Sequence, residues 1–506
     1  MRALIERIVQ SHSAESLVQR LHGEQGVTLL RSSSSGTPQP RYSFVAARPF
    51  LTFRAAGSRC ELRRNSAQEV IFGDPWRILE ALMARYELTE QMDLPFPLGG
   101  CFGFWGYDLK NFLEPALPRR AINDLEFPDC HLGFYDSVVA LDHELGATWI
   151  LATGIDDDGS RCASRAKQQR DFWLERLEHR GTSRLDFEES NPDHGRGAPL
   201  LIEVRDHSSS WRLEGLEAST EVWANLSRAE YLARVEQAQR YISSGDIYQV
   251  NLAQRLTSAF PFSAWRLFQV LSDVSPASFS AYYDAGDFQI VSSSPELFLR
   301  MSGSHIQTRP IKGTRPRSAD STRDSQLSYE LQTSPKELAE LVMITDLLRN
   351  DLGRVCEFGT IQVPDLARLE RYAHVQHLVS TIEGILRPDL THLSALAACF
   401  PGGSITGAPK FRAMQVIDEL EPVCRGPYTG AMGYLGFNGE SQLSMMIRTA
   451  LCKQGMAHFH VGAGIVADSV PEAEYHETLH KAQGFFEALR HCWHSYDRIF
   501  QRKVPS

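Results

Sequence analysis

The sequence predicts a globular protein that combines strands and helices, and three observations support this prediction. The chain has 506 residues, which is enough for two or three domains with a sizeable hydrophobic core. Hydrophobic residues make up 42% of the chain and charged residues 23%, as in ordinary soluble proteins. Short runs rich in β-branched and aromatic residues fill residues 26–155, and strand patterns alternate with helical patterns from residue 230 onward.

Charge, cysteine content and hydropathy exclude several classes of protein. A formal net charge of −10 argues against nucleic-acid binding, so any anionic ligand must be held by local positive charge. The nine cysteines include no C-x-x-C pair, which argues against a disulfide framework or a cysteine zinc site. No apolar run reaches about 18 residues, and the N-terminus does not resemble a signal peptide. We expect a cytoplasmic protein with no nucleic-acid or membrane partner.

A polar stretch divides the chain into two parts. Residues 188–197 read EESNPDHGRG, a composition typical of a linker. Ser227 and Glu230 then have the spacing of a capping box, which indicates the first turn of a helix. We therefore expect an N-terminal domain over residues 1–190, a linker over residues 191–226 and a second domain over residues 227–490.

Residues 292–317 contain the first candidate catalytic pair. Strand-like runs on both sides of the turn at residues 302–304 predict a β-hairpin. It places Glu296 at the start of one strand and Lys312 at the end of its neighbour, so a proton donor and an amine come close in space. The surrounding arginines are Arg309, Arg315 and Arg317. Crowded like charges lower the pKa of an ammonium group toward a usable nucleophile, whereas the alternative is a lysine that only meets solvent.

Two predicted helices each carry glutamates on one face. The first begins with Ser334 as N-cap and ends at Gly353, and the second begins at Pro471. The glutamates are Glu337 and Glu340 on the first helix and Glu474 and Glu477 on the second. Carboxylates from two helices suit a hard cation that keeps some of its waters, as Mg²⁺ does. The alternatives are a capping box that uses Glu337 and an ordinary surface pair between Glu477 and Lys481.

Three glycine-rich stretches are imperfect matches to known motifs. Residues 402–410 lack the lysine of a P-loop, although the helix that Pro409 opens could present backbone N–H groups to an anion. Residues 462–467 match G-x-G-x-x-A, but the next helix starts too late for dinucleotide binding, so we expect a glycine strand against a flat ligand. Cys101 lies in a sequence similar to the nucleophile loop of glutamine amidotransferases. No H-x-E partner follows it, and we expect Cys101 to be a packing residue.

Nine motifs occur in the order found in the chorismate-utilising enzymes, and the chain resembles this family. The motifs are GDIYQVNLAQR, SSSPE, RPIKGTRPR, KELAE with DLLRNDLGR, HLVS, FPGGSITGAPK, IRT, GAGIVADS and EYHETLHKA. They make residues 227–490 the expected chorismate-binding catalytic domain and residues 1–190 the family's variable N-terminal domain. The resemblance implies an α+β fold with two large packed antiparallel β-sheets flanked by helices.

The resemblance also implies roles for the matched residues. Glu296 is the general acid that protonates the departing C4 hydroxyl of chorismate, and His377 lies near that hydroxyl. Glu340 and Glu477 are ligands of Mg²⁺, which anchors the ring carboxylate, and Glu337 and Glu474 lie nearby. The expected substrate contacts are Gln249, Ser404, Tyr428, Arg448, Gly462, Gly464 and Lys481.

Within the family, the PIKGT and GDIYQVNLAQR motifs are similar to component I of aminodeoxychorismate synthases. That resemblance implies that the amine of Lys312 attacks C2 of chorismate and displaces the C4 hydroxyl. Ammonia then adds at C4 and gives 4-amino-4-deoxychorismate, a precursor of 4-aminobenzoate and folate. Gln249 stands where salicylate and isochorismate synthases have a lysine that activates water. The chain has no amidotransferase triad, so we expect the ammonia to come from a separate glutamine amidotransferase subunit.

Two alternatives stay open. Anthranilate synthase component I shares almost all of these residues but usually has alanine at the position of Lys312. The other alternative is a catalytically silent protein that senses an amino acid through its N-terminal domain. Residues 29–32, LLRS, faintly resemble the tryptophan-site motif of anthranilate synthases. The complete set of acid, nucleophile and metal positions argues against silence.

Overall fold

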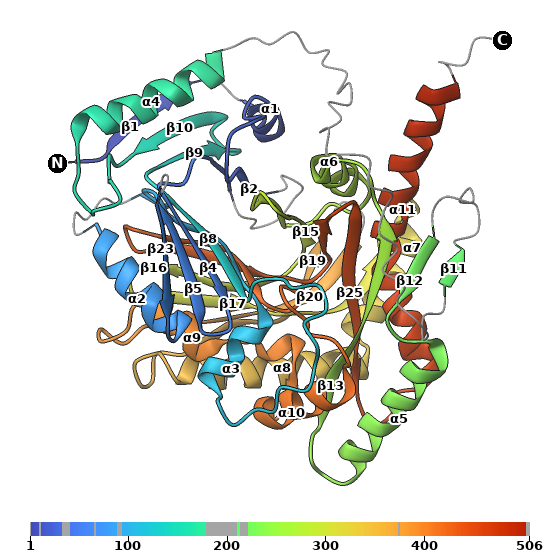
Figure 1. Ribbon diagram of the computed structural model, residues 1–506. Helices are drawn as coiled ribbons and strands as arrows, with labels where there is room; N and C mark the ends of the chain where they lie inside the picture. Colours follow the sequence, from blue (N-terminus) through green and yellow to red (C-terminus); the bar gives the residue numbers. More distant parts are fainter. Residues whose placement is uncertain are drawn as a thin grey trace.

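The computed structural model describes residues 2–9, 12–32, 41–64, 67–88, 94–178, 210–212, 221–372 and 375–501. Within these residues, the strands form two large sheets that helices flank (Figure 1). All strand pairs inside the two sheets are antiparallel, as β14 and β15 illustrate. The predicted α+β fold with two antiparallel sheets is therefore confirmed.

The first sheet combines strands from both ends of the chain. Its spatial order is β1 (Leu4–Ile8), β10 (Ala147–Ala152), β9 (Ser137–Asp142), β3 (Tyr42–Ala46), β2 (Thr28–Arg31), β14 (Phe279–Asp284), β15 (Gln289–Ser294), β24 (Thr449–Lys453), β25 (Met456–Ile465), β13 (Gln249–Ala259), β12 (Glu221–Ala224) and β11 (Ser210–Arg212). The short strand β21 (Gly407–Ala408) also pairs with β13.

The second sheet has the same mixed origin. Its spatial order is β18 (Ile311–Pro316), β20 (Val375–Ile385), β17 (His305–Arg309), β16 (Leu297–Ser302), β23 (Glu440–Met445), β22 (Ala431–Gly436), β7 (Gly100–Trp105), β8 (Cys130–Tyr135), β4 (Leu51–Ala56), β5 (Arg59–Arg64) and β6 (Ala67–Phe72). Strand β20 also pairs, along its other edge, with β19 (Gln362–Arg371).

Aromatic side chains join the two sheets face to face. The rings of Phe44 on β3 and Tyr434 on β22 meet edge to face with centroids 5.2 Å apart. His131 on β8 and Tyr283 on β14 share a buried hydrogen bond of 2.6 Å. Because each contact links a strand of one sheet with a strand of the other, the space between the sheets is a packed core rather than a channel.

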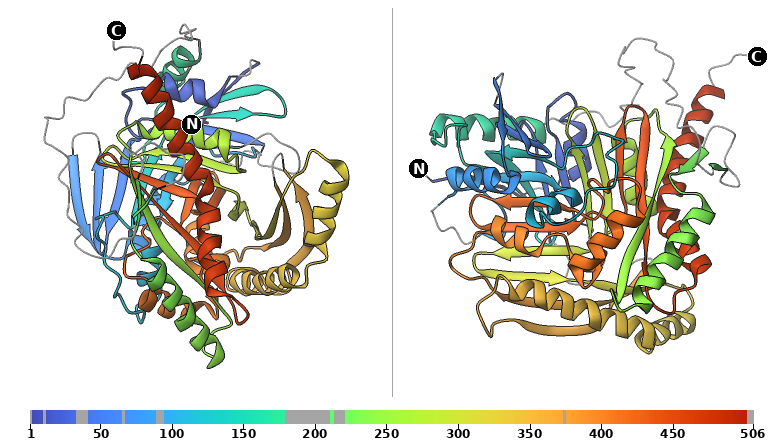
Figure 2. Two further views of the ribbon diagram at one scale, coloured as in Figure 1. Left: turned by 90° about the vertical axis from the view of Figure 1, so that its right-hand side faces the viewer. Right: turned by 60° about the horizontal axis from the view of Figure 1, so that its bottom comes forward.

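Helices cover the outer faces of both sheets. The helices are α1 (Ala14–Gln19), α2 (Pro75–Tyr86), α3 (Lys110–Leu113), α4 (Ala163–Glu178), α5 (Arg228–Ser243), α6 (Ala264–Val274), α7 (Ser321–Gln332), α8 (Pro335–Gly353), α9 (His392–Cys399), α10 (Lys410–Leu420) and α11 (Pro471–Gln501), with the 3₁₀ turns η1 (Tyr107–Leu109) and η2 (Gly403–Ile405). Figure 2 shows α11, in red, running along one side of the molecule beside α5 and α6. No helix of the described residues is long and apolar enough to cross a membrane.

Local sequence signals account for several helix ends. Ser227 accepts a hydrogen bond from Glu230, whose carboxylate accepts one from the backbone N–H of Ser227, so the predicted capping box is present at α5. Ser334 caps α8, and the helix ends at Gly353 as predicted. The carboxylate of Glu337 does not complete a capping box there but pairs with Arg315 at 3.4 Å. The side chain of Glu337 is therefore part of a tertiary contact.

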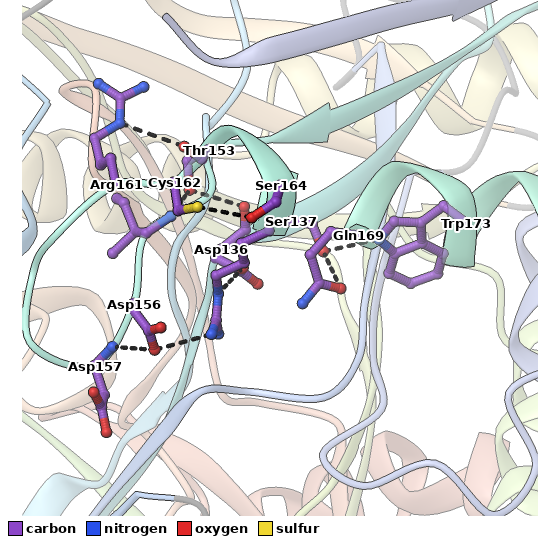
Figure 3. Close-up of polar contacts among 12 residues, drawn as sticks. Asp136, Ser137, Thr153, Asp156, Asp157, Arg161, Cys162, Ser164, Gln169 and Trp173 are labelled. Atoms are coloured by element: carbon purple, nitrogen blue, oxygen red, sulfur yellow. Dashed lines mark hydrogen bonds and ion pairs between the residues drawn. The ribbon is translucent and has the colours of Figure 1, made fainter. Parts of the chain in front are cut away.

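A polar network attaches α4 to the first sheet (Figure 3). The indole N–H of Trp173 donates a hydrogen bond of 2.9 Å to Ser137 on β9. Arg165 pairs with Asp136 at 2.8 Å and with Asp156 at 2.9 Å. These contacts lie between α4 and the strands that it covers, so they fix the helix in place.

The two predicted domains share both sheets. Residues 191–209 and 213–220 of the expected linker lie outside the described residues. Strand β2, from the N-terminal part, pairs with β14 through Leu30 and Ala281. Strand β7 pairs with β22 through Gly103 and Gly433. The domain boundaries therefore stay a prediction, but the two parts are joined by continuous backbone hydrogen bonding.

Candidate active site

The predicted hairpin is present, but Lys312 lies beyond it, because the second strand ends at Arg309 and Lys312 belongs to the next strand, β18. Strand β16 pairs with β17, and Ser302 lies opposite His305 at the turn. Strands β17 and β18 both run along β20, where Lys312 lies opposite Leu378 and Thr314 opposite His377. Gly313, with a φ of +67°, makes the irregularity between these two pairs. Glu296 lies just before β16, Lys312 is on β18 and His377 is on β20, so the strand beside Lys312 is β20 and not the predicted strand that begins near Glu296.

Glu296 is a buried carboxyl group with one strong partner. Its side chain is 6% exposed, and Oε1 accepts a hydrogen bond of 2.6 Å from the hydroxyl of Ser404. Burial raises the pKa of Glu296 to about 7, although the hydrogen bond from Ser404 and the charge of Lys312 act in the opposite direction. A carboxyl group with this pKa still holds its proton in part of the molecules at neutral pH. Glu296 can therefore donate a proton there.

The charges around Lys312 differ from the prediction. Each of the three neighbouring arginines pairs with a carboxylate: Arg309 with Glu370, Arg315 with Glu337 and Arg317 with Asp324. They therefore do not supply the uncompensated positive charge that the sequence suggested. Lys312 instead lies near enough to three other carboxyl groups for its charge to act on them, and these are Glu296, Glu340 and Glu477. The explanation by crowded like charges was wrong, because each arginine has a carboxylate partner that the local sequence pattern does not reveal.

His377 is buried and neutral. Its Nδ1 shares a hydrogen bond of 2.9 Å with the hydroxyl of Thr314, and its ring contacts that of Tyr372. Burial lowers the pKa of His377 to about 4, the charge of Arg448 lowers it further, and a hydrogen bond with the backbone of Gly313 opposes the change. A neutral imidazole can orient a substrate hydroxyl through a hydrogen bond but carries no charge at neutral pH.

The charge of a carboxylate on α11 acts on a carboxyl group of α8. Burial raises the pKa of Glu340; Lys312 and Lys336 oppose this rise, whereas the charges of Glu337 and Glu477 add to it. Burial would also raise the pKa of Glu477, but its ion pair with Lys481, at 2.7 Å, and the other lysines outweigh it and keep this pKa low. Glu340 and Glu477 therefore lie close enough to repel each other.

This arrangement fits a loosely held Mg²⁺. Among the described residues, no group of three or more histidine, cysteine, aspartate or glutamate side chains is placed to hold a metal ion. Mg²⁺, however, keeps several waters and often takes only one or two protein carboxylates together with a substrate anion. Glu340 and Glu477 repel each other, and a bound cation would relieve this repulsion. Glu474 contributes less, because its Oε1 accepts a hydrogen bond of 2.7 Å from Ser469.

Two cations are placed to receive carboxylates. Arg448 follows β23 with a φ of +49°, and burial lowers the pKa of its guanidinium. Within the described part of the chain, no carboxylate pairs with Arg448. Lys481 on α11 donates a hydrogen bond of 2.9 Å to the carbonyl of Gly462 as well as pairing with Glu477. A recessed guanidinium without a counter-ion is suited to bind an anionic ligand.

The glycines of β25 lie against two predicted contact residues. A Cβ atom on Gly464 would lie 2.6 Å from Nε2 of Gln249, and one on Gly462 would lie 3.0 Å from the hydroxyl of Tyr428. Burial raises the pKa of Tyr428 to about 12, so its hydroxyl keeps its proton. The structure thus places Gln249 and Tyr428 beside the glycine strand, and their contacts with the substrate stay a prediction.

The sequence analysis missed Arg425. Its guanidinium forms a buried ion pair with Glu421 at 2.6 Å and donates hydrogen bonds to the carbonyls of Asn251 and Ile405. It also lies over the ring of Tyr428. Arg425 therefore connects β13, the loop that carries Ser404 and the Tyr428 segment. Its only sequence signal was the i,i+4 spacing from Glu421, which is common on helix surfaces.

The other glycine-rich segments have structural roles. Lys410 pairs with the buried Asp351 of α8 at 2.7 Å, which fixes the loop at residues 402–410 against that helix. Helix α10 begins after Pro409, as predicted. Cys101 is fully buried on β7, and burial raises the pKa of its thiol to about 12. A thiol with this pKa is not a nucleophile at neutral pH, so the prediction of a packing role is confirmed.

Comparisons with known proteins agree with this geometry. The family model described as chorismate binding enzyme matches residues 34–487. Anthranilate synthase component 1 of Acetivibrio thermocellus is 36% identical over 479 residues, which are 94% of this chain and 92% of that protein. Aminodeoxychorismate synthase component 1 of Klebsiella aerogenes is 37% identical over 489 residues, which are 96% and 99% of the two chains. The two kinds of relative are thus about equally similar.

Solved structures show the same fold. The crystal structure of anthranilate synthase component I from Streptococcus pneumoniae TIGR4 has a TM-score of 0.73 at 29% identity and covers 93% of this chain and 97% of its own. MenF, the menaquinone-specific isochorismate synthase from Escherichia coli, has a TM-score of 0.66 at 18% identity, with 96% and 95% coverage. The similarity to MenF shows a shared fold and nothing more.

Proposed function

Because the chain belongs to the chorismate binding enzyme family, we propose that it converts chorismate and ammonia to 4-amino-4-deoxychorismate. The observation that carries the proposal is the position of Lys312. Its charge acts on the buried acid Glu296 and on the carboxylates Glu340 and Glu477, and its strand β18 pairs with β20, which carries the neutral His377. An amine next to a proton donor is the arrangement that a covalent exchange at the chorismate ring requires.

The proposed reaction has two displacement steps. The neutral amine of Lys312 forms a bond to C2, the ring double bonds shift, and the C4–O bond breaks. Glu296 gives its proton to the departing hydroxyl, which leaves as water, and becomes a carboxylate. Ammonia then forms a bond to C4, the double bonds shift back, and the bond between C2 and Lys312 breaks with its electron pair on the lysine nitrogen. The new C4 ammonium group returns one proton to the carboxylate of Glu296. The net change replaces the C4 hydroxyl with an amino group and releases one water molecule.

The remaining residues bind and orient the substrate. Arg448 and Lys481 hold carboxylates of chorismate, and the neutral His377 orients the C4 hydroxyl toward Glu296. Glu340 and Glu477 would hold Mg²⁺, which supplies positive charge to bind the ring carboxylate. Gln249 is an amide, which is too weak a base to take a proton from water. It therefore favours attack by a nitrogen nucleophile.

In this proposal, a separate subunit supplies the ammonia. The only residue of the chain that resembles an amidotransferase nucleophile, Cys101, is fully buried with a raised thiol pKa. Ammonium salts should therefore support turnover by the isolated chain, whereas glutamine should do so only with a glutamine amidotransferase subunit. Glutamine hydrolysis by the isolated chain would contradict this assignment.

Anthranilate synthesis is the second candidate, because a relative of that name is 36% identical over nearly the whole chain. The two activities differ in product: anthranilate forms with loss of pyruvate, whereas 4-amino-4-deoxychorismate keeps the enolpyruvyl group. Mass spectrometry of the products formed from chorismate, Mg²⁺ and ammonium chloride distinguishes them directly. Absence of turnover would instead favour a silent binding protein.

The nucleophile is tested with Lys312→Arg, which keeps the positive charge but removes the amine. We expect this variant to bind chorismate but to lose most ammonia-dependent product. The matched control is Lys167→Arg on the exposed face of α4, which should keep its activity. With unaltered protein and no ammonia, peptide mapping after a rapid acid quench should find chorismate-derived mass on the peptide that contains Lys312. Full activity of Lys312→Arg would overturn covalent catalysis in favour of direct attack by ammonia.

A further inference from the structure

On one face of β13, two amide side chains have buried oxygen atoms that accept no hydrogen bond from the described residues. Oε1 of Gln249 and Oδ1 of Asn251 have no hydrogen-bond partner among the described residues. The two residues are two positions apart on the strand, so their side chains point to the same side of the sheet. A buried acceptor without a donor is costly, which makes such an atom a place where a ligand can donate a hydrogen bond.

The glycines of β25 let these two amides lie directly against the neighbouring strand. Asn251 lies opposite Gly464, and Ala253 lies opposite Gly462. A Cβ on Gly462 would lie 2.5 Å from Oδ1 of Asn251, and a Cβ on Gly464 would lie 2.6 Å from Nε2 of Gln249. Neither glycine has a positive φ. The backbone conformation therefore does not require glycine at these positions, whereas the close approach of the two amides, and at Gly462 of the carbonyl of Leu252, does.

The backbone of Asn251 is fixed on both sides, so its amide has a defined position. Its N–H donates a hydrogen bond of 2.8 Å to the carbonyl of Thr406, and its carbonyl accepts one of 2.7 Å from Arg425. The hydroxyl of Tyr428 lies near the same glycine, 3.0 Å from the Cβ position of Gly462. Asn251 thus faces the site that contains Tyr428 and Lys481.

We propose that the amide oxygen of Asn251 binds the ammonia nucleophile. This inference rests on the proposed function, and it assigns a residue to the second substrate. The carboxylates of chorismate can only accept hydrogen bonds at neutral pH, and its one hydroxyl is engaged with Glu296 and His377 in the proposed reaction. Ammonia is the reactant that has N–H groups to donate. A hydrogen bond from ammonia to an acceptor leaves its lone pair free to attack carbon.

The reaction itself requires neutral ammonia, because only the neutral form has a lone pair that can attack carbon. The nearby Lys481 pairs with Glu477 at 2.7 Å, so its charge is compensated. Amide oxygens are also too weakly basic to activate water. The site therefore selects a nucleophile that attacks without losing a proton first.

The test measures how Asn251→Leu changes the kinetics of the full chain with Mg²⁺ and ammonium chloride at one fixed alkaline pH. Leucine has a similar size but cannot accept a hydrogen bond. We expect the KM for ammonia to rise about tenfold, the effect of one lost hydrogen bond, while the KM for chorismate changes little. Asn251→Ala, which adds no bulk, should give the same split if the leucine variant does not fold.

Gln254→Leu is the matched control. Gln254 is on the same strand and also has a buried oxygen without a donor, but its amide N–H group donates to Thr478 of α11, on the other face of the strand. This variant should leave the KM for ammonia unchanged. An unchanged KM for ammonia in Asn251→Leu, or an equal rise in the KM for chorismate, would overturn the assignment of Asn251 alone. Absence of any nitrogen-containing product from the unaltered chain would overturn the proposed function as well.

Discussion

The hydroxyl of Ser404 donates a hydrogen bond of 2.6 Å to the carboxyl group of Glu296, and both side chains are buried. The two residues are far apart in sequence and come from different motifs. Burial favours the protonated form of Glu296, whereas this hydrogen bond favours the carboxylate. The balance between these two effects gives Glu296 a pKa of about 7, which is suitable for a general acid at neutral pH.

Ser404→Ala should raise the pKa of Glu296 further, because the carboxylate loses its hydrogen bond. Only protonated Glu296 acts as the acid, so kcat falls as the pH rises through this pKa. The alkaline limb of the kcat profile should therefore move to higher pH by about one unit, measured with both substrates saturating. Ser258→Ala, which removes a hydroxyl bonded to the carbonyl of Ala259 at the strand end, should leave the limb in place. A limb that moves to lower pH would contradict this account of Glu296.

Glu296→Gln should abolish turnover but stabilise the fold at alkaline pH. The pKa of Glu296 is raised from 4.5 to about 7 in the folded chain. Unfolding therefore releases a proton between these values, and the wild-type protein loses stability as the pH rises through this range. Above pH 7, glutamine at position 296 has no buried charge to destabilise the fold. The free energy of unfolding should therefore rise by up to about 3 kcal/mol relative to wild type. The gain should shrink as the pH falls toward 4.5, which urea denaturation at a series of pH values would measure. A variant less stable than wild type at alkaline pH would contradict the burial argument.

Glu340→Gln and Glu477→Gln should each raise the Mg²⁺ concentration needed for half-maximal turnover, because a weakly held ion loses an anionic ligand. We expect at least about a tenfold increase without loss of folding. Glu487→Gln, further along α11 and bonded to Gln483, is the control and should behave as wild type. Near-normal turnover of both site variants at low Mg²⁺ would remove these residues from the metal site.

Arg425→Met should destabilise the protein strongly, because it leaves the carboxylate of Glu421 buried without its cation. Breaking such a pair costs about 3–5 kcal/mol in the free energy of unfolding. Arg425→Lys keeps the charge but not the two-pronged geometry, so an intermediate loss is expected. Arg412→Met removes a looser pair with Asp246, at 3.5 Å, and should cost less than about 1 kcal/mol. Chemical denaturation measures all three, and similar losses for Arg425→Met and Arg412→Met would contradict the role of the buried pair.

Local signals in the sequence predicted the elements that carry the site. The cap at Ser334, the capping box at Ser227 and the turn at residues 302–304 all appear in the structure. These features depend on hydrogen bonds between residues a few positions apart, so the sequence contains them directly. The motifs likewise proposed Lys312 and His377, which the neighbouring strands β18 and β20 carry, and Glu296, which lies just before β16.

The tertiary structure decided which charges and which faces meet. The arginines near Lys312 have carboxylate partners up to 61 positions away, so the charge that the sequence attributed to them is compensated. The shared sheets join strands of the N-terminal and C-terminal parts, as β2 with β14 and β7 with β22 show. Asn251 became a candidate only when β25 placed two glycines opposite its face of β13. Pairing between distant strands depends on the whole chain topology, and no local pattern specifies it. The sequence by itself therefore determined the local elements and the candidate residues that they carry, whereas only the tertiary structure determined the partners of those residues.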